Sequence, residues 1–371
     1  MIHIELIPLE HPLPADVESF GGGDTLYSSL RWNRAFSGRD AASSVVVARD
    51  DRGAVRGTLL AHLMPEGSRN TVYDVGTLLG TAAHVAPRSA QLLLGARNGQ
   101  WNGFRVAARA PSERAEVLNA LVGGASSIAD VPVGFLYGTR SDAAEVATAM
   151  GPDATLLLTE VNSTVQLGHG GFEAYTAGLP AKRRSDVRRD LEAAGGFPMS
   201  SDVGSDDPVV TAWAGLAAET QRRHGQPADA ERLASYLRTC IDGAERAIGF
   251  WYGERSTPTA FALALVQDGV LWVRLVGLRY DEHGGTSGRY PGVLVFGPVR
   301  LAAAEGLVAV DLGAGLADFK GRRGARTEAR WSAILSGDSA IDRDAVDARN
   351  AAEAARLRVD LVDSGSGSVR V

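Results

Sequence analysis

The strongest constraint on the fold is the order of apolar segments in the second half of the chain. Three strand-like segments follow one another there, at residues 248–252, 260–266 and 270–278. Gln267-Asp268-Gly269 is a typical turn between the last two, so this pair is predicted to form a β-hairpin. A segment with Val295 and Val299 at helical spacing follows, and then a strand over 307–312. This order indicates a mixed α/β sheet flanked by helices.

The first half of the chain also mixes strands with helices. Strands are predicted over 44–48 and 57–60, joined by a turn at Asp50–Gly53. A helix is expected to end at Gly123-Gly124, because its apolar stripe stops there. The remaining predicted elements of this half are a strand over 133–137 and a helix over 141–150.

A chain of 371 residues exceeds what one typical core holds, so two domains are expected. Gly151-Pro152-Asp153 interrupts the chain, and a buried type of strand follows at 154–159. We therefore predict an N-terminal domain over 1–155 and a C-terminal domain over 156–371.

Composition narrows the classes of function. The sequence is 45% hydrophobic, yet no apolar stretch approaches the length of a membrane span, and the first residues do not resemble a signal peptide. Cys240 is the only cysteine, and the seven histidines form no ligand pair, so no metal site and no disulfide are expected. The protein is predicted to be cytoplasmic, with no membrane partner.

The net charge of −6 argues against a DNA partner, because a large nucleic-acid footprint needs clustered cations. It does not exclude contact with a short single-stranded end. Among 38 basic residues only Lys182 and Lys320 are lysines. Each lysine either occupies a site that a wide guanidinium does not fit or is there by chance.

Two segments carry a family resemblance. The first is the basic stretch Leu179–Leu191. The second runs from Tyr290-Pro291-Gly292 through Asp311-Leu312-Gly313 to Phe319-Lys320-Gly321-Arg322-Arg323-Gly324. Both resemble GNAT-superfamily transferases of the Fem-like type. The resemblance implies two GNAT-like domains, each with a mixed β-sheet flanked by helices, with the donor bound by the C-terminal one. Such relatives transfer aminoacyl groups from aminoacyl-tRNA, or acyl groups from acyl-CoA, to amines.

The resemblance places Lys320 in a catalytic role, as a compact positive charge next to the reacting ester or the terminal adenosine phosphate. Phe319 would stack on a base of the donor. Arg322 and Arg323, in the basic stretch that follows, are predicted to bind the donor too. The alternative is a surface lysine after a turn, with Phe319 in the core.

Asp311 follows a buried strand and precedes Gly313. It could orient Lys320 or accept the proton of the attacking amine, which makes it the second catalytic candidate. The alternative is an aspartate that only caps a turn.

Lys182, Arg184 and Arg188 lie in the basic segment and are predicted to bind the acceptor. Arg184 and Arg188 are one helical turn apart and could clamp a phosphate or a carboxylate. The alternative is a solvated helix in which Asp186 and Asp190 balance the charge.

Arg289, Tyr290 and Gly292 are predicted to bind the donor. CoA-dependent members of the superfamily hold pyrophosphate on an Arg/Gln-x-x-Gly-x-Gly/Ala loop at a helix N-terminus. Here Leu294 replaces the last small residue, Pro291 removes an N–H donor, and Pro298 should start or kink the helix. These departures favour an aminoacyl-tRNA donor over acyl-CoA, while the negative net charge favours the reverse.

The sequence therefore predicts a transferase that moves an aminoacyl group from aminoacyl-tRNA to the amine of a small molecule or a peptidoglycan-type precursor, with no tightly bound cofactor. An acyl-CoA-dependent N-acyltransferase is the alternative enzyme, and a GNAT-like binding module is the alternative without catalysis. The sequence names neither the acceptor nor the oligomeric state.

Overall fold

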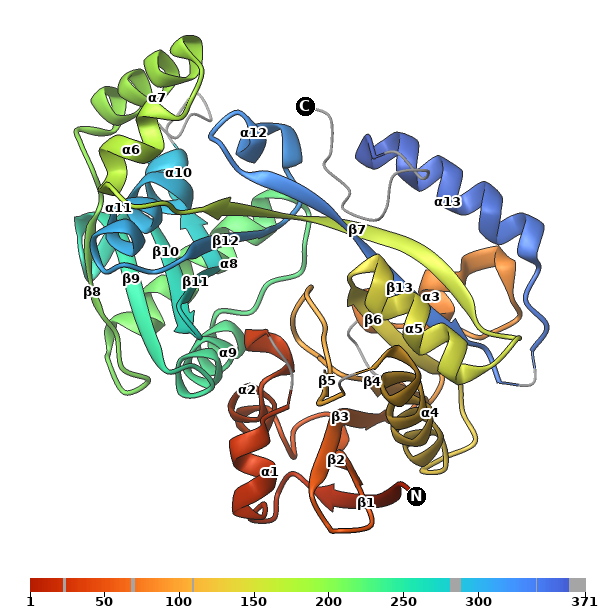
Figure 1. Cartoon of the computed structure of the whole chain (residues 1–371). Helices are drawn as coiled ribbons and strands as arrows, with labels where there is room; N and C mark the ends of the chain where they lie inside the picture. Colours follow the sequence, from red (N-terminus) through yellow and green to blue (C-terminus); the bar gives the residue numbers. More distant parts are fainter. Residues whose placement is uncertain (23–24, 68–70, 109, 281–287, 338, 360–371) are drawn as a thin grey trace. The chain divides into compact units, whose positions relative to one another are not determined.

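The computed structural model describes residues 1–22, 25–67, 71–108, 110–280, 288–337 and 339–359 (Figure 1). The chain forms two compact units. Unit 1 holds Met1–Val161 and the segment that starts at Glu328, and unit 2 holds Asn162–Thr327. Strands β7 (Thr155–Gln166) and β13 (Arg326–Leu335) each run through a boundary between the units. The division into domains 1–155 and 156–371 stays a prediction.

Unit 1 contains a mixed sheet with the strand order β1-β2-β3-β4-β6-β13-β7, and β5 pairs with β3. Strands β4 and β6 are parallel, and β6 and β13 are antiparallel. Its other strands are β1 His3–Pro8, β2 Ala42–Arg49, β3 Val55–Met64, β4 Gln91–Leu94, β5 Arg105–Val106 and β6 Val133–Gly138. The helices of unit 1 are α1 Ala15–Phe20, α2 Leu30–Ala35, α3 Val75–Leu79, α4 Pro111–Ser126, α5 Arg140–Met150 and α13 Arg343–Leu357.

The predicted end of one helix in unit 1 is wrong. Helix α4 continues through Gly123 and Gly124 to Ser126. Glycine inside a helix costs about 1 kcal/mol relative to alanine. That cost is offset because Val117 and Leu121 bury their side chains against β3, at a glycine (Gly57) that leaves room for both. Tertiary packing therefore extends the helix past the point where the sequence pattern stops.

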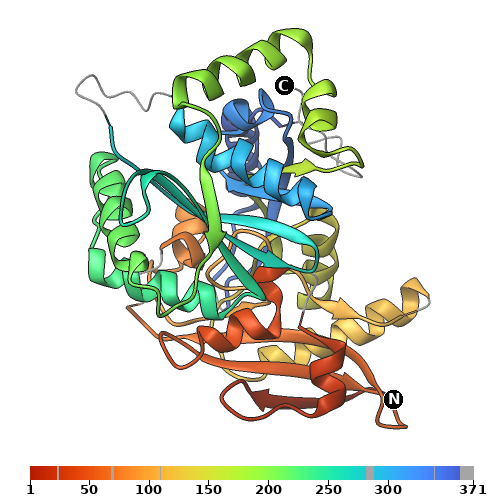
Figure 2. The same cartoon turned by 90° about the vertical axis from the view of Figure 1, so that its left-hand side faces the viewer.

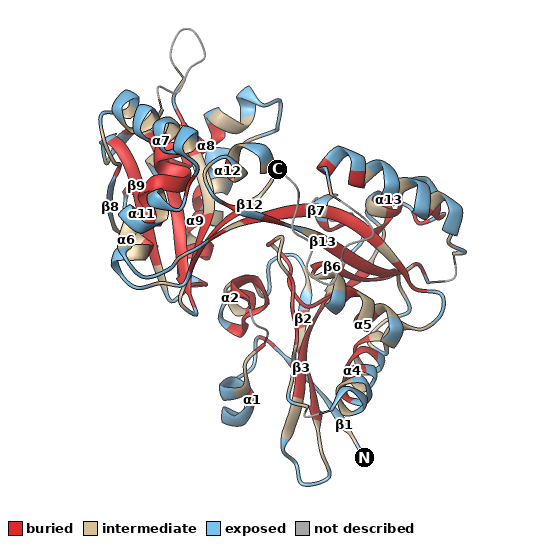
Figure 3. Cartoon of the chain, turned by 45° about the horizontal axis from the view of Figure 1, so that its top comes forward, coloured by how far each residue is buried: buried red, intermediate tan, exposed pale blue. Residues whose placement is uncertain are grey.

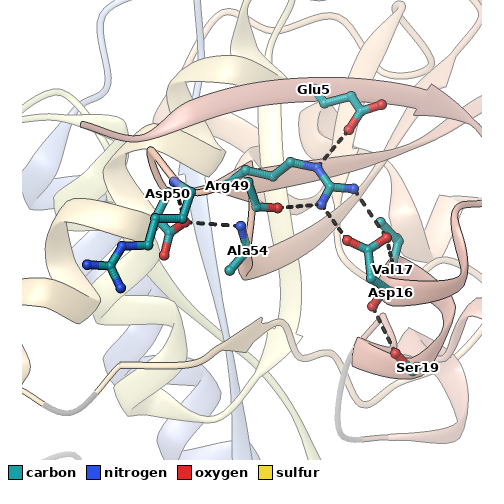
Figure 4. Close-up of polar contacts among 9 residues, drawn as sticks. Glu5, Asp16, Val17, Ser19, Arg49, Asp50 and Ala54 are labelled. Atoms are coloured by element: carbon teal, nitrogen blue, oxygen red, sulfur yellow. Dashed lines mark hydrogen bonds and ion pairs between the residues drawn. The ribbon is translucent and has the colours of Figure 1, made fainter.

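The predicted turn at residues 50–53 is confirmed, and an arginine beside it joins three elements (Figure 4). Asp50 accepts hydrogen bonds from the backbone N–H of Ala54 at 3.0 Å, which closes the turn. The Arg49 guanidinium donates to Glu5 of β1 at 3.1 Å and to Asp16 of α1 at 2.5 Å. The hydrogen bond from Arg49 lowers the pKa of the Asp16 carboxyl.

The strands of unit 2 have the order β7-β12-β11-β10-β9-β8, again with parallel and antiparallel pairs. Strands β11 and β12 are parallel, and the other described pairs are antiparallel. The bounds are β8 Met199–Asp202, β9 Arg246–Glu254, β10 Thr257–Gln267, β11 Val270–Leu278 and β12 Ala309–Ala314. The hairpin predicted for the segments 260–266 and 270–278 is confirmed, and so is the mixed α/β fold class.

Helices cover both faces of the sheet in unit 2 (Figure 2). They are α6 Gly171–Ala177, α7 Ala181–Ala194, α8 Val209–Arg223, α9 Ala230–Asp242, α10 Arg289–Pro291, the π-helical η4 Gly292–Phe296, α11 Gly297–Ala304 and α12 Ala317–Gly321. On one face, Trp213 of α8 packs where Gly249 of β9 leaves room. On the other face, Phe250 packs against Gly297. Successive strand residues point to opposite faces, which explains this alternation.

The wide turn of η4 precedes Pro298, which the sequence predicted would start or kink a helix. Proline has no N–H and clashes with the carbonyl four residues earlier. The backbone widens before it, so that the N–H of Gly297 bonds to the oxygen of Gly292. Pro298 then lies in the first turn of α11, which confirms the prediction.

Most residues of the strands are buried, whereas most residues of α7 are exposed (Figure 3). Among the residues that the structure describes, no helix has the length and the apolar character needed to cross a bilayer.

Candidate active site

The candidate site lies where the parallel strands β11 and β12 part. Their described ladder runs from Val270 to Trp272, which pairs with Asp311. Just beyond, each strand has an irregularity. Leu275 and Val273 of β11 pair with consecutive residues of β10, so Arg274 forms a bulge. The register between β12 and β7 shifts after Asp311. Bulges bend strands and are common beside active sites. Here both irregularities lie where the described pairing between β11 and β12 ends.

Asp311 is 1% exposed and is bound from two sides. Its carboxylate accepts a hydrogen bond from the N–H of Gly313 at 2.9 Å. From β7, the amide of Asn162 donates to it, as does the Thr164 hydroxyl at 3.3 Å. Asp311 therefore does cap a turn, the alternative role considered from the sequence, and it also fastens β12 to β7. Its catalytic role stays a prediction.

Lys320 is 3% exposed, so the alternative of a surface lysine is wrong. Its ammonium donates to the carbonyl oxygens of Gly313 at 2.9 Å and Ala314 at 2.8 Å. The backbone has positive φ at Gly313, Gly315 and Leu316, and these turns bring α12 back onto the end of β12. The buried positive charge thus lies at the point where β11 and β12 part. A slender ammonium between two carbonyls is a site that a planar guanidinium does not match. The other lysine, Lys182, is exposed.

Phe319 lies between an aromatic ring and a guanidinium. Its ring centroid is 5.0 Å from that of Tyr290. The Arg323 guanidinium lies 3.8 Å from the centroid of Phe319 and also donates to the Phe319 carbonyl at 3.1 Å. Burial raises the pKa of Tyr290 to about 12, so its phenol stays protonated at neutral pH. Three of the predicted donor-binding residues are therefore brought into contact with one another.

Arg323, two residues after the end of α12, also connects this part of the chain to α7. It donates to Asp190 at 2.5 Å, and the two side chains are only 14% and 16% exposed. Asp190 has a second contact, at the start of α10. A Cβ atom on Gly288 would lie 2.2 Å from the Asp190 carbonyl oxygen, so the two backbones nearly touch. Helix α7 thus packs against the start of the α10–α11 segment.

The remaining predicted donor-binding residues differ in exposure. Gly292 is buried against the Tyr252 hydroxyl, which a Cβ atom would approach to 2.2 Å, so packing alone requires a glycine there. Arg289 is half-buried, whereas Arg322 is exposed on the far end of α12. Their role in binding a donor stays a prediction.

The predicted acceptor-binding residues all lie on α7 and are exposed. Arg184 donates to the Leu179 carbonyl at 2.6 Å, and Arg188 donates to the Ser185 hydroxyl at 3.3 Å. Both arginines line a pocket between α6 and α7, whereas Lys182 does not. The structure does not bring them into contact with Lys320 or Asp311.

Sequence reasoning missed several residues of the site. Arg274, at the bulge of β11, is half-buried and donates to the Tyr236 hydroxyl. Asn162 binds Asp311, and it lies 149 residues away in sequence. An arginine in an otherwise apolar strand is the signal that could have identified Arg274. No local signal indicates Asn162.

No family model and no curated protein matches this sequence. Solved structures do resemble it. The crystal structure of FemX superposes with a TM-score of 0.61 at 10% identity, covering 93% of this chain and 99% of that one. The C-terminal domain of a putative lysylphosphatidylglycerol synthetase from Agrobacterium fabrum gives 0.51 at 12% identity, covering 89% and 92%. A conserved protein of unknown function from Bacteroides thetaiotaomicron gives 0.51 at 13%, covering 91% and 100%. The Fem-like resemblance is therefore confirmed at the level of the fold.

Proposed function

We propose that the chain is an acyltransferase that moves an aminoacyl group from aminoacyl-tRNA to the amine of a small molecule or a peptidoglycan-type precursor. The observation that carries the proposal is the parting of β11 and β12 beside a buried lysine. In this proposal, the carbonyl group of the donor lies at the two strand ends, close to the positive charge of Lys320. Charge placed in advance where an oxyanion develops is a major source of catalysis.

The reaction joins the amine nitrogen of the acceptor to the ester carbon of the donor. The ester C–O bond breaks, and the amine proton passes to the leaving ribose oxygen, which becomes a hydroxyl. In this proposal, Lys320 supplies positive charge near the ester and holds the Gly313–Ala314 backbone in place. Asp311 positions that backbone through the Gly313 N–H.

The start of the α10–α11 segment, at Gly288, favours aminoacyl-tRNA over acyl-CoA as the donor. A pyrophosphate cradle needs free N–H groups at that end, but Asp190 of α7 packs against Gly288 there. Pro291 has no N–H, and Leu294 is buried in the core. Tyr290 and Arg323 already pack against the Phe319 ring, so a nucleobase of the donor would have to stack on the Tyr290 side of this cluster rather than on Phe319 itself.

An acyl-CoA donor is the second candidate, favoured by the net charge of −6, which disfavours a tRNA partner. Titration with acetyl-CoA, free CoA and a non-hydrolysable aminoacyl-RNA mimic of the acceptor stem distinguishes the two. Binding of the RNA mimic alone is expected. Tight binding of CoA would mean that the donor is acyl-CoA and not aminoacyl-tRNA, while the proposed acyl transfer would still stand.

Catalysis is tested with Lys320→Ala. Turnover should fall by at least ~10-fold, which corresponds to about 1.4 kcal/mol of barrier. Normal turnover by a folded variant would remove Lys320 from the mechanism. The absence of turnover by the unmodified protein, with every donor that binds, would favour a binding module. A far-UV circular dichroism spectrum of Lys320→Ala, compared with that of the unmodified protein, checks that the variant is folded.

A further inference from the structure

A pocket of about 750 Å³ lies between α6 and α7 in unit 2. Its lining comes from these two helices and from the Gly195–Gly196 turn after α7, and it includes none of the residues around Lys320. Volumes of ~300–1,000 Å³ are typical of small-molecule sites. The pocket is therefore large enough for a ligand of its own.

One part of the lining is apolar. Phe172 of α6 and Val187 and Leu191 of α7 contribute to it. Val187 is 3% exposed, while Phe172 and Leu191 pack partly buried against the core of unit 2. The ring of Phe172 is fixed by edge contact with Phe197, with a centroid distance of 4.9 Å. These contacts make a firm apolar wall rather than a loose surface patch.

Another part of the lining is cationic. Arg184 and Arg188 lie one helical turn apart, a spacing that lets two guanidinium groups reach one anion. Glu192 also lines the pocket, so the lining has two cations and one anion. Neither arginine has a carboxylate partner among the described residues.

The charges of α7 are sorted by face. Asp186 binds both Arg183, at 3.4 Å, and Arg189, at 2.9 Å. Asp190 is taken by Arg323 of unit 2. Asp190 lies two residues after Arg188, which is about 200° around the helix. Asp186 and Asp190 thus neutralise one side of α7, and the pocket side keeps two arginines and a single carboxylate, Glu192.

We propose that the α6–α7 pocket binds a small amphiphilic anion. Its carboxylate or phosphate head lies on Arg184 and Arg188, and its apolar body lies against Phe172, Val187 and Leu191. The apolar wall and the paired cations share one pocket, and this combination matches neither a free inorganic anion nor a neutral lipid chain. The pocket includes neither Lys320 nor Asp311, and the proposal gives Arg184 and Arg188 this ligand in place of the acceptor predicted from the sequence.

The test is calorimetric titration of the full chain with decyl phosphate and with decanoate, both below their aggregation concentrations. We expect one site per chain for at least one of them, and the better ligand identifies the head group. Across butyl, hexyl, octyl and decyl chains, affinity should rise by about fourfold per methylene until the pocket is full. Decanol and inorganic phosphate should each bind at least ~10-fold more weakly, because each lacks one part of the recognition.

The double variant Arg184→Gln and Arg188→Gln should weaken binding by at least ~10-fold. The matched control is Arg183→Gln with Arg189→Gln, which removes the same charge from the same helix but leaves the pocket lining intact. Arg188→Gln alone covers the case in which the double variant misfolds, because Arg188 is exposed.

Four results would overturn the proposal. Equal losses in both double variants would mean a general electrostatic effect. If decanol bound as tightly as the amphiphilic anions, the pocket would be only an apolar groove. If inorganic phosphate bound as tightly as they do, the pocket would be only an anion site. Binding to phosphatidylcholine vesicles containing phosphatidylglycerol, without binding to either soluble amphiphile, would indicate a membrane surface instead.

Discussion

The ammonium nitrogen of Lys320 lies 2.8 Å from the carbonyl oxygen of Ala314. This hydrogen bond, with its neighbour to Gly313, attaches α12 to the end of β12. A buried carbonyl without a donor costs about 1–3 kcal/mol. The conformation of the strand end and the position of the charge are thus determined by the same side chain.

Lys320→Met should lower the free energy of unfolding by about 1–3 kcal/mol, because the part-buried carbonyls of Gly313 and Ala314 lose their donor. Lys320→Arg should fail to restore it, since the wider group does not fit a 3% exposed position. Urea unfolding measures both. A fully stable Met variant would show that the carbonyls find other donors.

The ion pair between Arg323 and Asp190 should couple α12 to α7. A double-mutant cycle with Arg323→Met and Asp190→Leu is expected to give an interaction energy of about 1–3 kcal/mol. Its low exposure sets it apart from surface pairs, which contribute about 0–1 kcal/mol. The more exposed pair of Arg356 and Glu353, whose side chains are 58% and 20% exposed, provides the comparison within the same chain. Equal energies for the two pairs would contradict the expected effect of burial.

Gly288 and Gly306 allow the contact with α7 to be separated from backbone strain. Both have φ of +74°, but only Gly288 has a neighbour within 4 Å of a built Cβ atom, the Asp190 carbonyl at 2.2 Å. Gly306→Ala should cost about 1 kcal/mol from positive φ alone. Gly288→Ala should cost at least ~1 kcal/mol more. Thermal or urea unfolding of the two variants checks the difference, and equal costs would mean that α7 is free to shift.

His62 should make stability depend on pH. Its Nε2–H donates to the Gly95 carbonyl at 2.9 Å, so its Nδ1 accepts from the Ser43 hydroxyl at 2.8 Å. Burial, with the nearby charge of Arg97, lowers its pKa to about 3 from 6.5. Below pH 6.5 the His62 imidazole is therefore protonated in the unfolded chain, whereas it stays neutral in the folded chain. As the pH falls from 6.5 towards 3, the free energy of unfolding should therefore fall by about 1.4 kcal/mol per pH unit.

Guanidinium unfolding at two pH values, one above 6.5 and one about a unit below it, tests this loss. His62→Gln should flatten the pH dependence even if the variant is less stable overall. His3→Asn is the control, because His3 is exposed. A pH dependence unchanged in His62→Gln would assign the loss to another group.

Local patterns predicted much of unit 2. The alternation of apolar residues and the turn at Asp268-Gly269 were enough for the β10–β11 hairpin, and Pro298 marked the start of α11. Helix α4 shows where such patterns end, because glycines at 123 and 124 were outweighed by burial against β3. A pattern within one segment cannot include the energy of packing against a distant one.

The candidate site was predicted as a set of residues, not as an arrangement. Lys320, Asp311 and Phe319 were named from a resemblance, but the burial of Lys320 depends on three positive φ values in the preceding turn. The Asp190 partner of Arg323 lies 133 residues away in sequence. Contacts over such separations depend on the folded topology, which no single segment encodes.

Strand β13 lies between β6 and β7 in the sheet of unit 1, yet it is made after all of unit 2. During synthesis, β6 and β7 therefore lack their shared neighbour until β13 has been translated. At ~5–20 residues per second, unit 2 takes about 10–30 s to translate. For that time, each nascent chain presents two unpaired strand edges, and unpaired edges invite pairing with other chains.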